Sequence, residues 1–134
     1  WSSDVCSSDL KSLLQPEKYL LCLTTKHLRQ LFVKYRLGLL DLVVNEGRKK
    51  SFETEQRLCP LCNSAIEDEI HVTFVCPFYI ELRKRYIPER FLSKPPVLAF
   101  VSILNSNDET TIVHLSLFIK HAMQHRSELL KNIL

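Results

Sequence analysis

Residues 57–79 read Arg-Leu-Cys-Pro-Leu-Cys-Asn-Ser-Ala-Ile-Glu-Asp-Glu-Ile-His-Val-Thr-Phe-Val-Cys-Pro-Phe-Tyr, and this stretch decides the fold. It contains four metal-ligand side chains in the pattern C-x2-C-x8-H-x4-C: Cys59, Cys62, His71 and Cys76. Thiolates and imidazole suit Zn²⁺, which takes four such ligands in a tetrahedron. A two-residue spacer lets a tight turn aim two thiolates inward, and the next eight residues return the chain across the ion. The spacing therefore predicts one Zn²⁺ site of the Cys-Cys-His-Cys type.

Other interpretations of these four residues fit less well. Free cysteines are often simply buried, but four ligand-type side chains in so short a window disfavour that explanation. Three cysteines cannot pair off as disulfides. Four protein ligands leave no open position for water, so we expect the zinc to be structural rather than catalytic. Three thiolates on Zn²⁺ leave about one negative charge, and Arg57 is the neighbouring cation that we expect to balance it.

The composition of the whole chain is typical of a soluble, mainly helical protein. Its 134 residues are 46% hydrophobic and 25% charged, with only two glycines. A chain of this length can bury a core without help from a metal. No apolar run approaches the roughly 20 residues that cross a bilayer, so we exclude a membrane span. We expect a mainly α fold: a small helical domain with one structural Cys-Cys-His-Cys zinc knuckle.

The segment before the metal motif is predicted to be helical at first. Pro16 suits a first helical turn, and residues 19–32 carry an apolar stripe at helical spacing. Gly38 is expected to end or bend this helix. The dense apolar run 39–44 fits a helix or a strand equally well.

Prolines delimit the helices that follow the motif. One helix is predicted to begin at Pro77 and to end before Pro88, because proline is tolerated in a first turn but not in a helix interior. A shorter helix is predicted to open at Pro95-Pro96. Its expected apolar face consists of Val97, Phe100, Val101 and Leu104.

A final helix of about six turns is predicted near the C-terminus. Ser106-Asn107-Asp108-Glu109 has the form of a capping box, and an apolar stripe follows it at Ile112, Leu115, Ile119, Ala122, Met123, Leu129 and Leu130. We divide the chain into four parts: residues 1–10 as a leader, 11–56 as a helical segment and loop, 57–87 as the zinc knuckle with a basic helix, and 88–134 as a helical tail.

The first ten residues contain a short internal repeat, because Ser2-Ser3-Asp4 recurs as Ser7-Ser8-Asp9. Residues 5–10 resemble the translation of a common sequencing adapter, so we interpret 1–10 as a non-native leader. A flexible Ser-rich leader is the competing interpretation, but it does not explain the repeat. The one methionine is Met123. We therefore expect the natural protein to continue upstream of Lys11 and this chain to be a fragment.

Basic residues flank the metal motif on both sides. If the zinc loop brings the two groups together, they form a cationic surface beside Tyr79 and Tyr86, which suits phosphate contact and base stacking. A solvated helix face plus a charged loop explains the pattern equally well, and the net charge of +3 permits nucleic-acid contact without arguing for it. The candidate contacts are Arg48, Lys49, Lys50, Arg83, Lys84 and Arg85, with Arg90 nearby.

Three further groups carry weaker signals. His121 and His125 have an i,i+4 spacing that can hold a metal, but no third ligand accompanies them, so a solvated helix face is preferred. The acidic run 67–69 is interpreted as the polar first turn of a helix leading into His71, where carboxylates favour the positive end of the helix dipole. Cys22 is expected to be a buried core residue.

The residues around the ligands resemble the C-terminal region of non-LTR (LINE-type) retrotransposon reverse transcriptases. The similar strings are Arg57-Leu58-Cys59-Pro60-Leu61-Cys62, Ile66-Glu67-Asp68-Glu69-Ile70-His71, Cys76-Pro77-Phe78-Tyr79 and Leu82-Arg83, preceded by Glu46-Gly47-Arg48. The resemblance covers about residues 26–133 and is strongest over 47–86. The pair Val72-Thr73 departs from it, because the family usually has bulkier residues there.

This resemblance implies that the four ligands bind Zn²⁺ and that the region helps a polyprotein hold RNA or DNA during target-primed reverse transcription. It implies a partner in the upstream polymerase domain, no membrane contact, and an intracellular location, nuclear or cytoplasmic or both. The fragment itself is not expected to be an enzyme, because the polymerase aspartates would lie upstream of Lys11. Two rival hypotheses stay open: a zinc-stapled protein-interaction module without nucleic-acid contact, and a nuclease that uses residues 67–69.

Overall fold

The computed structural model describes residues 19, 22–23, 25–40, 42 and 58–133, and that part of the chain is mostly helical. Its elements are α3 (Lys26–Leu37), η2 (His71–Val75), η3 (Pro77–Tyr79), α5 (Ile80–Tyr86), α6 (Glu89–Leu92), α7 (Pro96–Leu104) and α8 (Glu109–Ile133). Extended pairing within the described residues is limited to one isolated antiparallel bridge between Leu58 and Ile66. The mainly α fold expected from the sequence is confirmed.

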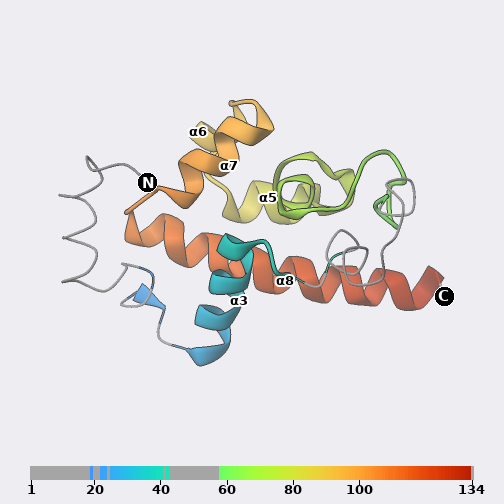
Figure 1. Cartoon of the computed structure of the whole chain (residues 1–134), viewed down its shortest axis with the longest axis horizontal. Coiled ribbons are helices and arrows are strands. Elements are labelled where there is room, and N and C mark those ends of the chain that lie inside the picture. The colour runs from blue at the N-terminus through green and yellow to red at the C-terminus, as the bar shows by residue number, and fades with distance from the viewer. Residues whose placement is uncertain (1–18, 20–21, 24, 41, 43–57, 134) are drawn as a thin grey trace.

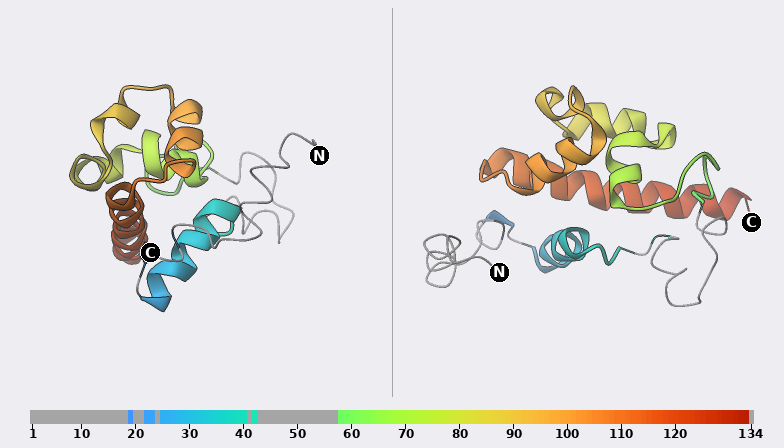
Figure 2. Two further views of the ribbon diagram at one scale, coloured as in Figure 1. Left: turned by 90° about the vertical axis from the view of Figure 1, so that its left-hand side faces the viewer. Right: turned by 45° about the horizontal axis from the view of Figure 1, so that its top comes forward.

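The long helix α8 is the element against which α3 and α5 pack. It spans 25 residues, and α3 crosses it steeply while α5 packs against another part of its surface (Figures 1 and 2). Five of its apolar side chains are almost completely buried at helical spacing: Ile112, Leu115, Phe118, Ile119 and Ala122. Apolar residues three and four apart lie on one helix face, so this stripe buries a continuous surface.

The beginning of α8 differs in detail from the predicted capping box. Asp108, not Ser106, caps the helix: its Oδ2 accepts hydrogen bonds from the backbone N–H (3.0 Å) and the hydroxyl (2.7 Å) of Thr111. Ser106 instead accepts from the backbone N–H of Asp108 at 3.2 Å. Because α8 begins at Glu109, Asp108 and not Ser106 occupies the position immediately before the helix, from which a side chain can cap the N–H of the third helical residue.

The helix expected from Pro16 onwards is interrupted. Tyr19 and Cys22 are helical, but Thr25 has an extended backbone and caps a new helix, α3, by accepting from the N–H of Leu28 at 3.3 Å. Gly38 ends α3 in the left-handed conformation, with φ of 69°, as a C-terminal glycine commonly does. Pro16, the leader 1–10 and most of the run 39–44 lie outside the described residues.

Prolines begin the helices after the metal motif as predicted. Pro77 opens a single 3₁₀ turn that continues into α5, and Pro96 opens α7. The short helix α6 after Pro88 was not predicted. The expected apolar face of α7 is only half right. Phe100 and Leu104 pack against the core, but Val97 and Val101 are 61% and 50% exposed, whereas Ala99 and Ile103 are buried.

The buried side chains form one core that includes residues on both sides of the metal motif. It joins Phe32 and Tyr35 of α3 to Tyr79, to Ala99 and Ile103 of α7, and to the apolar stripe of α8. The stretches 57–87 and 88–134, treated as separate parts from the sequence, therefore share a core.

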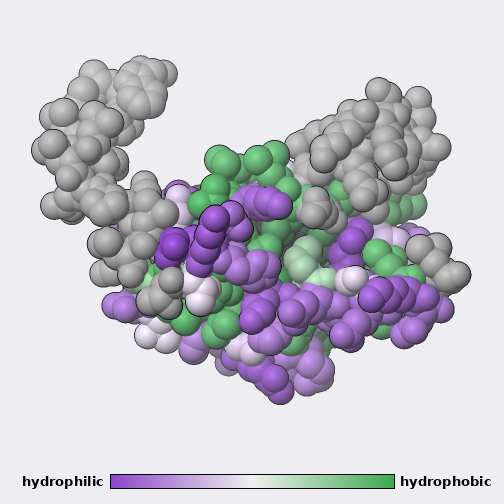
Figure 3. All heavy atoms as spheres, turned by 90° about the horizontal axis from the view of Figure 1, so that it is seen from below, coloured by the Kyte–Doolittle hydropathy of each residue, from purple (hydrophilic) through white to green (hydrophobic). Residues whose placement is uncertain are grey.

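One face of the molecule shows how polar and apolar side chains are distributed on its surface. On the face drawn in Figure 3, hydrophilic side chains cover most of the area, with hydrophobic ones gathered in patches between them. Among the described helices, none combines the length and the apolar character needed to cross a membrane.

Candidate metal centre

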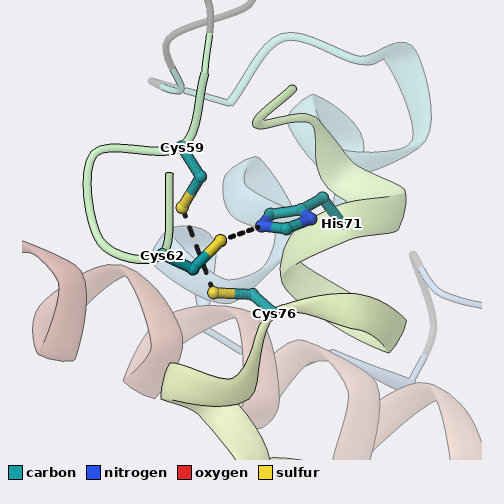
Figure 4. Close-up of side chains that lie close together, drawn as sticks. All are labelled: Cys59, Cys62, His71 and Cys76. Atoms are coloured by element: carbon teal, nitrogen blue, oxygen red, sulfur yellow. Dashed lines mark hydrogen bonds between the residues drawn. The ribbon is translucent and has the colours of Figure 1, made fainter. Parts of the chain in front are cut away.

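The four predicted ligands converge on one point. Their ligand atoms all lie within 4.8 Å of one another, and the side chains of Cys59, Cys62, His71 and Cys76 point toward a common centre (Figure 4). The sulfur atoms of Cys59 and Cys76 are 4.0 Å apart, and Sγ of Cys62 lies 3.3 Å from Nε2 of His71. The group is thus positioned to bind a single metal ion, as the spacing predicted.

A tight turn presents the first two ligands. The backbone N–H of Asn63 donates to the carbonyl of Cys59 at 2.9 Å, and the N–H of Cys59 donates to the carbonyl of Ala65 at 2.8 Å. Asn63 has a positive φ of 55°, a conformation that asparagine tolerates better than most residues. This turn brings Cys59 and Cys62 to the same side of the loop.

An unusual helical turn presents the other two ligands. Asp68 accepts from the N–H of His71 at 2.8 Å and starts the segment, and residues 71–75 then form a π turn. The N–H of Cys76 donates to the carbonyl of His71 at 2.7 Å, a bond across five residues. In an α-helix, residues five apart are about 140° apart around the axis. The wider π turn reduces this angle, and the side chains of His71 and Cys76 reach the same centre.

Burial controls the protonation of the ligands. It raises the pKa of the Cys76 thiol to about 12 and that of Cys59 above its usual range, and it lowers the pKa of His71. Burial also acts to raise the pKa of Cys62, but hydrogen bonds with Ser64, Cys59 and Cys76 together outweigh this and lower the pKa overall. Without a cation the Cys59 and Cys76 thiols stay protonated at neutral pH, so a metal ion has to displace protons when it binds.

The ring nitrogens of His71 have different surroundings. Nε2 faces the sulfur atoms and is therefore the nitrogen placed to bind an ion. The buried Nδ1 has no hydrogen-bond partner within the described residues, so they do not supply the acceptor that usually orients a metal-bound histidine.

Arg83 clamps the ligand segment from the inside. Its guanidinium donates to the carbonyls of Thr73 (2.6 Å), Cys76 (2.8 Å) and Val72 (3.2 Å), and the residue is only 9% exposed. This differs from the sequence expectation, which placed Arg83 among the nucleic-acid contacts. The π turn leaves carbonyls that lack regular helix partners, and a guanidinium with five donors can satisfy several of them at once.

A buried ion pair joins the segment that contains the four ligands (residues 58–79, the metal loop) to the C-terminal helix α8. Glu67 is fully buried and accepts two hydrogen bonds of 2.8 Å from Arg126 of α8. Oε2 of Glu67 also lies 4.0 Å from Sγ of Cys59. The sequence interpretation of Glu67 as part of a polar first helical turn is therefore wrong; Asp68 has that role. Arg126 was missed, because the two residues are 59 positions apart and no local pattern links them.

A second buried connection joins the π turn to α3. The hydroxyls of Tyr35 and Thr73 are hydrogen-bonded at 2.6 Å, and Thr73 donates to the carbonyl of Glu69 at 2.7 Å. The carboxylate of Glu69 accepts from the N–H of Leu40 at 3.3 Å. Burial keeps the pKa of Tyr35 above its usual value, so the phenol stays neutral and able to donate.

The other sequence candidates are placed as follows. His121 stacks on Tyr86 with ring centroids 5.6 Å apart, and His125 packs edge-on against Tyr79 at 6.1 Å. These histidines are therefore aromatic packing partners rather than a simple solvated face. Cys22 is half-buried. Arg48, Lys49, Lys50 and Arg57 lie outside the described residues.

The fold and site together define a small helical domain with a Cys₃His cluster that is positioned to bind a metal ion. No protein-family model, curated protein or solved structure matches the chain significantly.

Proposed function

We propose that the Cys₃His cluster binds one zinc ion as a structural staple. The observation that carries this proposal is the size of the cluster. A tetrahedral ion with Zn–S bonds of about 2.3 Å and a Zn–N bond of about 2.0–2.1 Å has edges of about 3.5–3.8 Å. The S–S separation of 4.0 Å and the S–N separation of 3.3 Å lie on either side of that range. Four protein ligands leave no open position, so the zinc has a structural rather than a catalytic role.

The charges around the cluster support the same assignment. Zinc with three thiolates and a neutral imidazole carries one negative charge, and buried Glu67 adds another. The guanidinium groups of Arg83 and Arg126 supply two positive charges against the same segment. Buried charges are tolerated when they are paired in this way.

We propose further that the domain binds nucleic acid through the outer surface of α5 and of the adjoining α6 region. Lys84 and Arg85 of α5 are exposed, as are Arg90 of α6 and Lys94, which follows α6. Arg83 points inward, and helical geometry turns its two successors about 100° and 200° away from it, toward solvent. The resemblance to the C-terminal region of non-LTR retrotransposon reverse transcriptases supports this function and makes an upstream polymerase domain the proposed neighbour.

Metal analysis and binding measurements test the proposal. We expect one zinc per chain, and binding of RNA or DNA that weakens steeply with salt, because phosphate contacts release counterions. The double variant Lys84→Gln/Arg85→Gln should bind more weakly. Lys34→Gln/Lys131→Gln, which removes two exposed cations elsewhere, is the matched control. Equal binding by the two double variants would remove the basis for nucleic-acid contact at α5, and a fully folded chain without metal would overturn the staple.

A protein-interaction module is a second candidate, favoured by one observation. Val97, Leu98 and Val101 of α7 are 61%, 59% and 50% exposed and lie on neighbouring positions of one short helix. An apolar docking face binds with little dependence on salt. This candidate is tested by measuring the affinity of the domain for its polymerase neighbour. If Val101→Ser lowers that affinity and added salt leaves it unchanged, the domain is better described as a protein-interaction module.

A further inference from the structure

Beside the cations of α5 the surface is hollowed into an open pocket of about 650 Å³. It lies between α5, α6 and α8, and the elements that surround it can be followed in Figure 1. Its lining comprises Lys84, Arg85, Tyr86, Ile87, Pro88, Glu89, Leu92, Ser93 and His114. This volume falls within the roughly 300–1,000 Å³ of sites that take small organic molecules.

The pocket combines cations with an aromatic wall. Lys84 and Arg85 are exposed, so their charges are available to a ligand. Tyr86 is held in place by its neighbours: its ring stacks on His121 at 5.6 Å with an interplanar angle of 7°, and meets His114 edge-on at 6.4 Å. A ring that is already fixed loses little side-chain entropy when a ligand packs on it.

The lining selects among anionic ligands. A phosphate group satisfies Lys84 and Arg85, but it uses neither the aromatic ring nor the apolar side chain of Leu92. Glu89 disfavours a ligand that is anionic throughout, such as a polyphosphate. A nucleotide unit has a phosphate for the cations, a flat base for the aromatic wall, and base N–H donors that a carboxylate can accept.

We propose that this pocket receives an unpaired nucleotide, so that the domain prefers single-stranded over double-stranded nucleic acid. In a duplex the bases are stacked inside the helix and cannot enter a concave site, whereas a single strand can turn a base outward. The inference rests on the proposed nucleic-acid function and specifies which form of the polymer is bound and where.

Fluorescence anisotropy with short labelled oligonucleotides tests the pocket. The probes are a single strand of about ten nucleotides, the duplex of the same sequence, and the same single strand with abasic sites. We expect tighter binding of the intact single strand than of either other probe. Tyr86→Leu should weaken single-strand binding about 5-fold or more, which corresponds to the roughly 1–3 kcal/mol of a base–aromatic stack. It should leave binding of the abasic strand unchanged.

Charge and stacking can be separated by the salt dependence. Lys84→Gln/Arg85→Gln should lower the slope of log affinity against log salt by about 1.4, because each phosphate contact to a single strand contributes about 0.7. Tyr86→Leu should leave the slope unchanged, and Tyr86→Phe, which keeps the ring, should bind like the unaltered protein. Zinc content and helical circular dichroism of each variant verify folding. If Tyr86→Leu does not fold, the comparison of intact and abasic strands on the unaltered protein decides the matter.

The outcomes distinguish the pocket from the proposed function. Equal affinity for intact and abasic strands, or preference for the duplex, would overturn the proposal that the pocket receives a nucleotide. Neither result would contradict nucleic-acid binding by the domain. Failure of the unaltered protein to bind any probe at about 50 mM salt overturns both.

Discussion

Two regions of this domain are stabilised by different means. The metal loop, residues 58–79, contains only short helical turns, and polar contacts hold it: the Arg83 clamp and the Glu67–Arg126 ion pair, beside the four converging candidate ligands. The region formed by α7 and α8 is regular and is stabilised by buried apolar side chains such as Ile103 and Phe118. The difference indicates that polar contacts can order an irregular loop when a helical scaffold supplies the partners.

Removing the metal should have the largest effect on stability, and the effect should be confined to the metal loop. Chelation, or the variant Cys76→Ser, leaves the loop without its ligand bonds, which in zinc-finger peptides are worth about 10–16 kcal/mol of apparent free energy. Hydrogen exchange should show loss of amide protection over residues 58–79 and retained protection in the central turns of α8. Uniform protection after chelation would mean that the loop does not depend on a metal, and uniform loss would mean that the two regions are not separable.

Truncation of Phe118 should have the next largest effect, on the other region. Its side chain is fully buried on α8, and Phe118→Ala should lower the free energy of unfolding by about 3–5 kcal/mol. Urea denaturation measures the loss. Zinc stoichiometry in the folded protein should remain one per chain, which is the control that separates this variant from the ligand variants. If the folded Phe118→Ala protein bound less zinc per chain than the unaltered protein, the two regions would not be stabilised independently.

The ion pair between the regions should give a smaller effect. Arg126→Met leaves the Glu67 carboxylate buried without its partner; because the Arg126 side chain is 14% exposed, we expect about 2–3 kcal/mol, less than the 3–5 kcal/mol of a fully buried pair. Glu67→Gln alone should also destabilise. The double variant should lose less than the sum of the two single ones. Additive losses in this double-mutant cycle would show that the two side chains do not stabilise each other.

The smallest effect is expected at the beginning of α8. Asp108→Ala removes the cap and should lower the free energy of unfolding by about 1 kcal/mol. Asn107→Ala, at the exposed position beside it, is the control and should change stability by less than about 0.5 kcal/mol. Thermal denaturation compares the two. Equal effects at 107 and 108 would assign the cap to another residue.

The predictable features were those encoded by neighbouring residues. The spacing of Cys59, Cys62, His71 and Cys76 predicted a cluster that the structure confirms, and prolines predicted the beginnings of α7 and of the helix after Cys76. The π turn could not be predicted in this way, because nothing in residues 71–75 distinguishes it from an α turn. It becomes favourable when the ligands and the Arg83 clamp compensate its irregular carbonyls.

The role of each charged residue depended on the tertiary structure. Arg83, Lys84 and Arg85 are equivalent in a charge pattern, yet one is buried and two are exposed, because α5 packs one face on the metal loop. Glu67 and Asp68 are neighbours in the same acidic run, but Glu67 pairs with Arg126, whereas Asp68 caps a helical turn.

The sequence by itself determined the helical class, the four ligands and the proline-defined starts of the later helices, because these follow from spacing and local backbone preference. Only the tertiary structure decided which face of α7 is buried, which cations remain available for a partner, and that the metal loop is tied to α8 through Arg126. The physical reason is that burial and ion pairing depend on residues up to 59 positions apart, and such contacts arise only when the chain has folded.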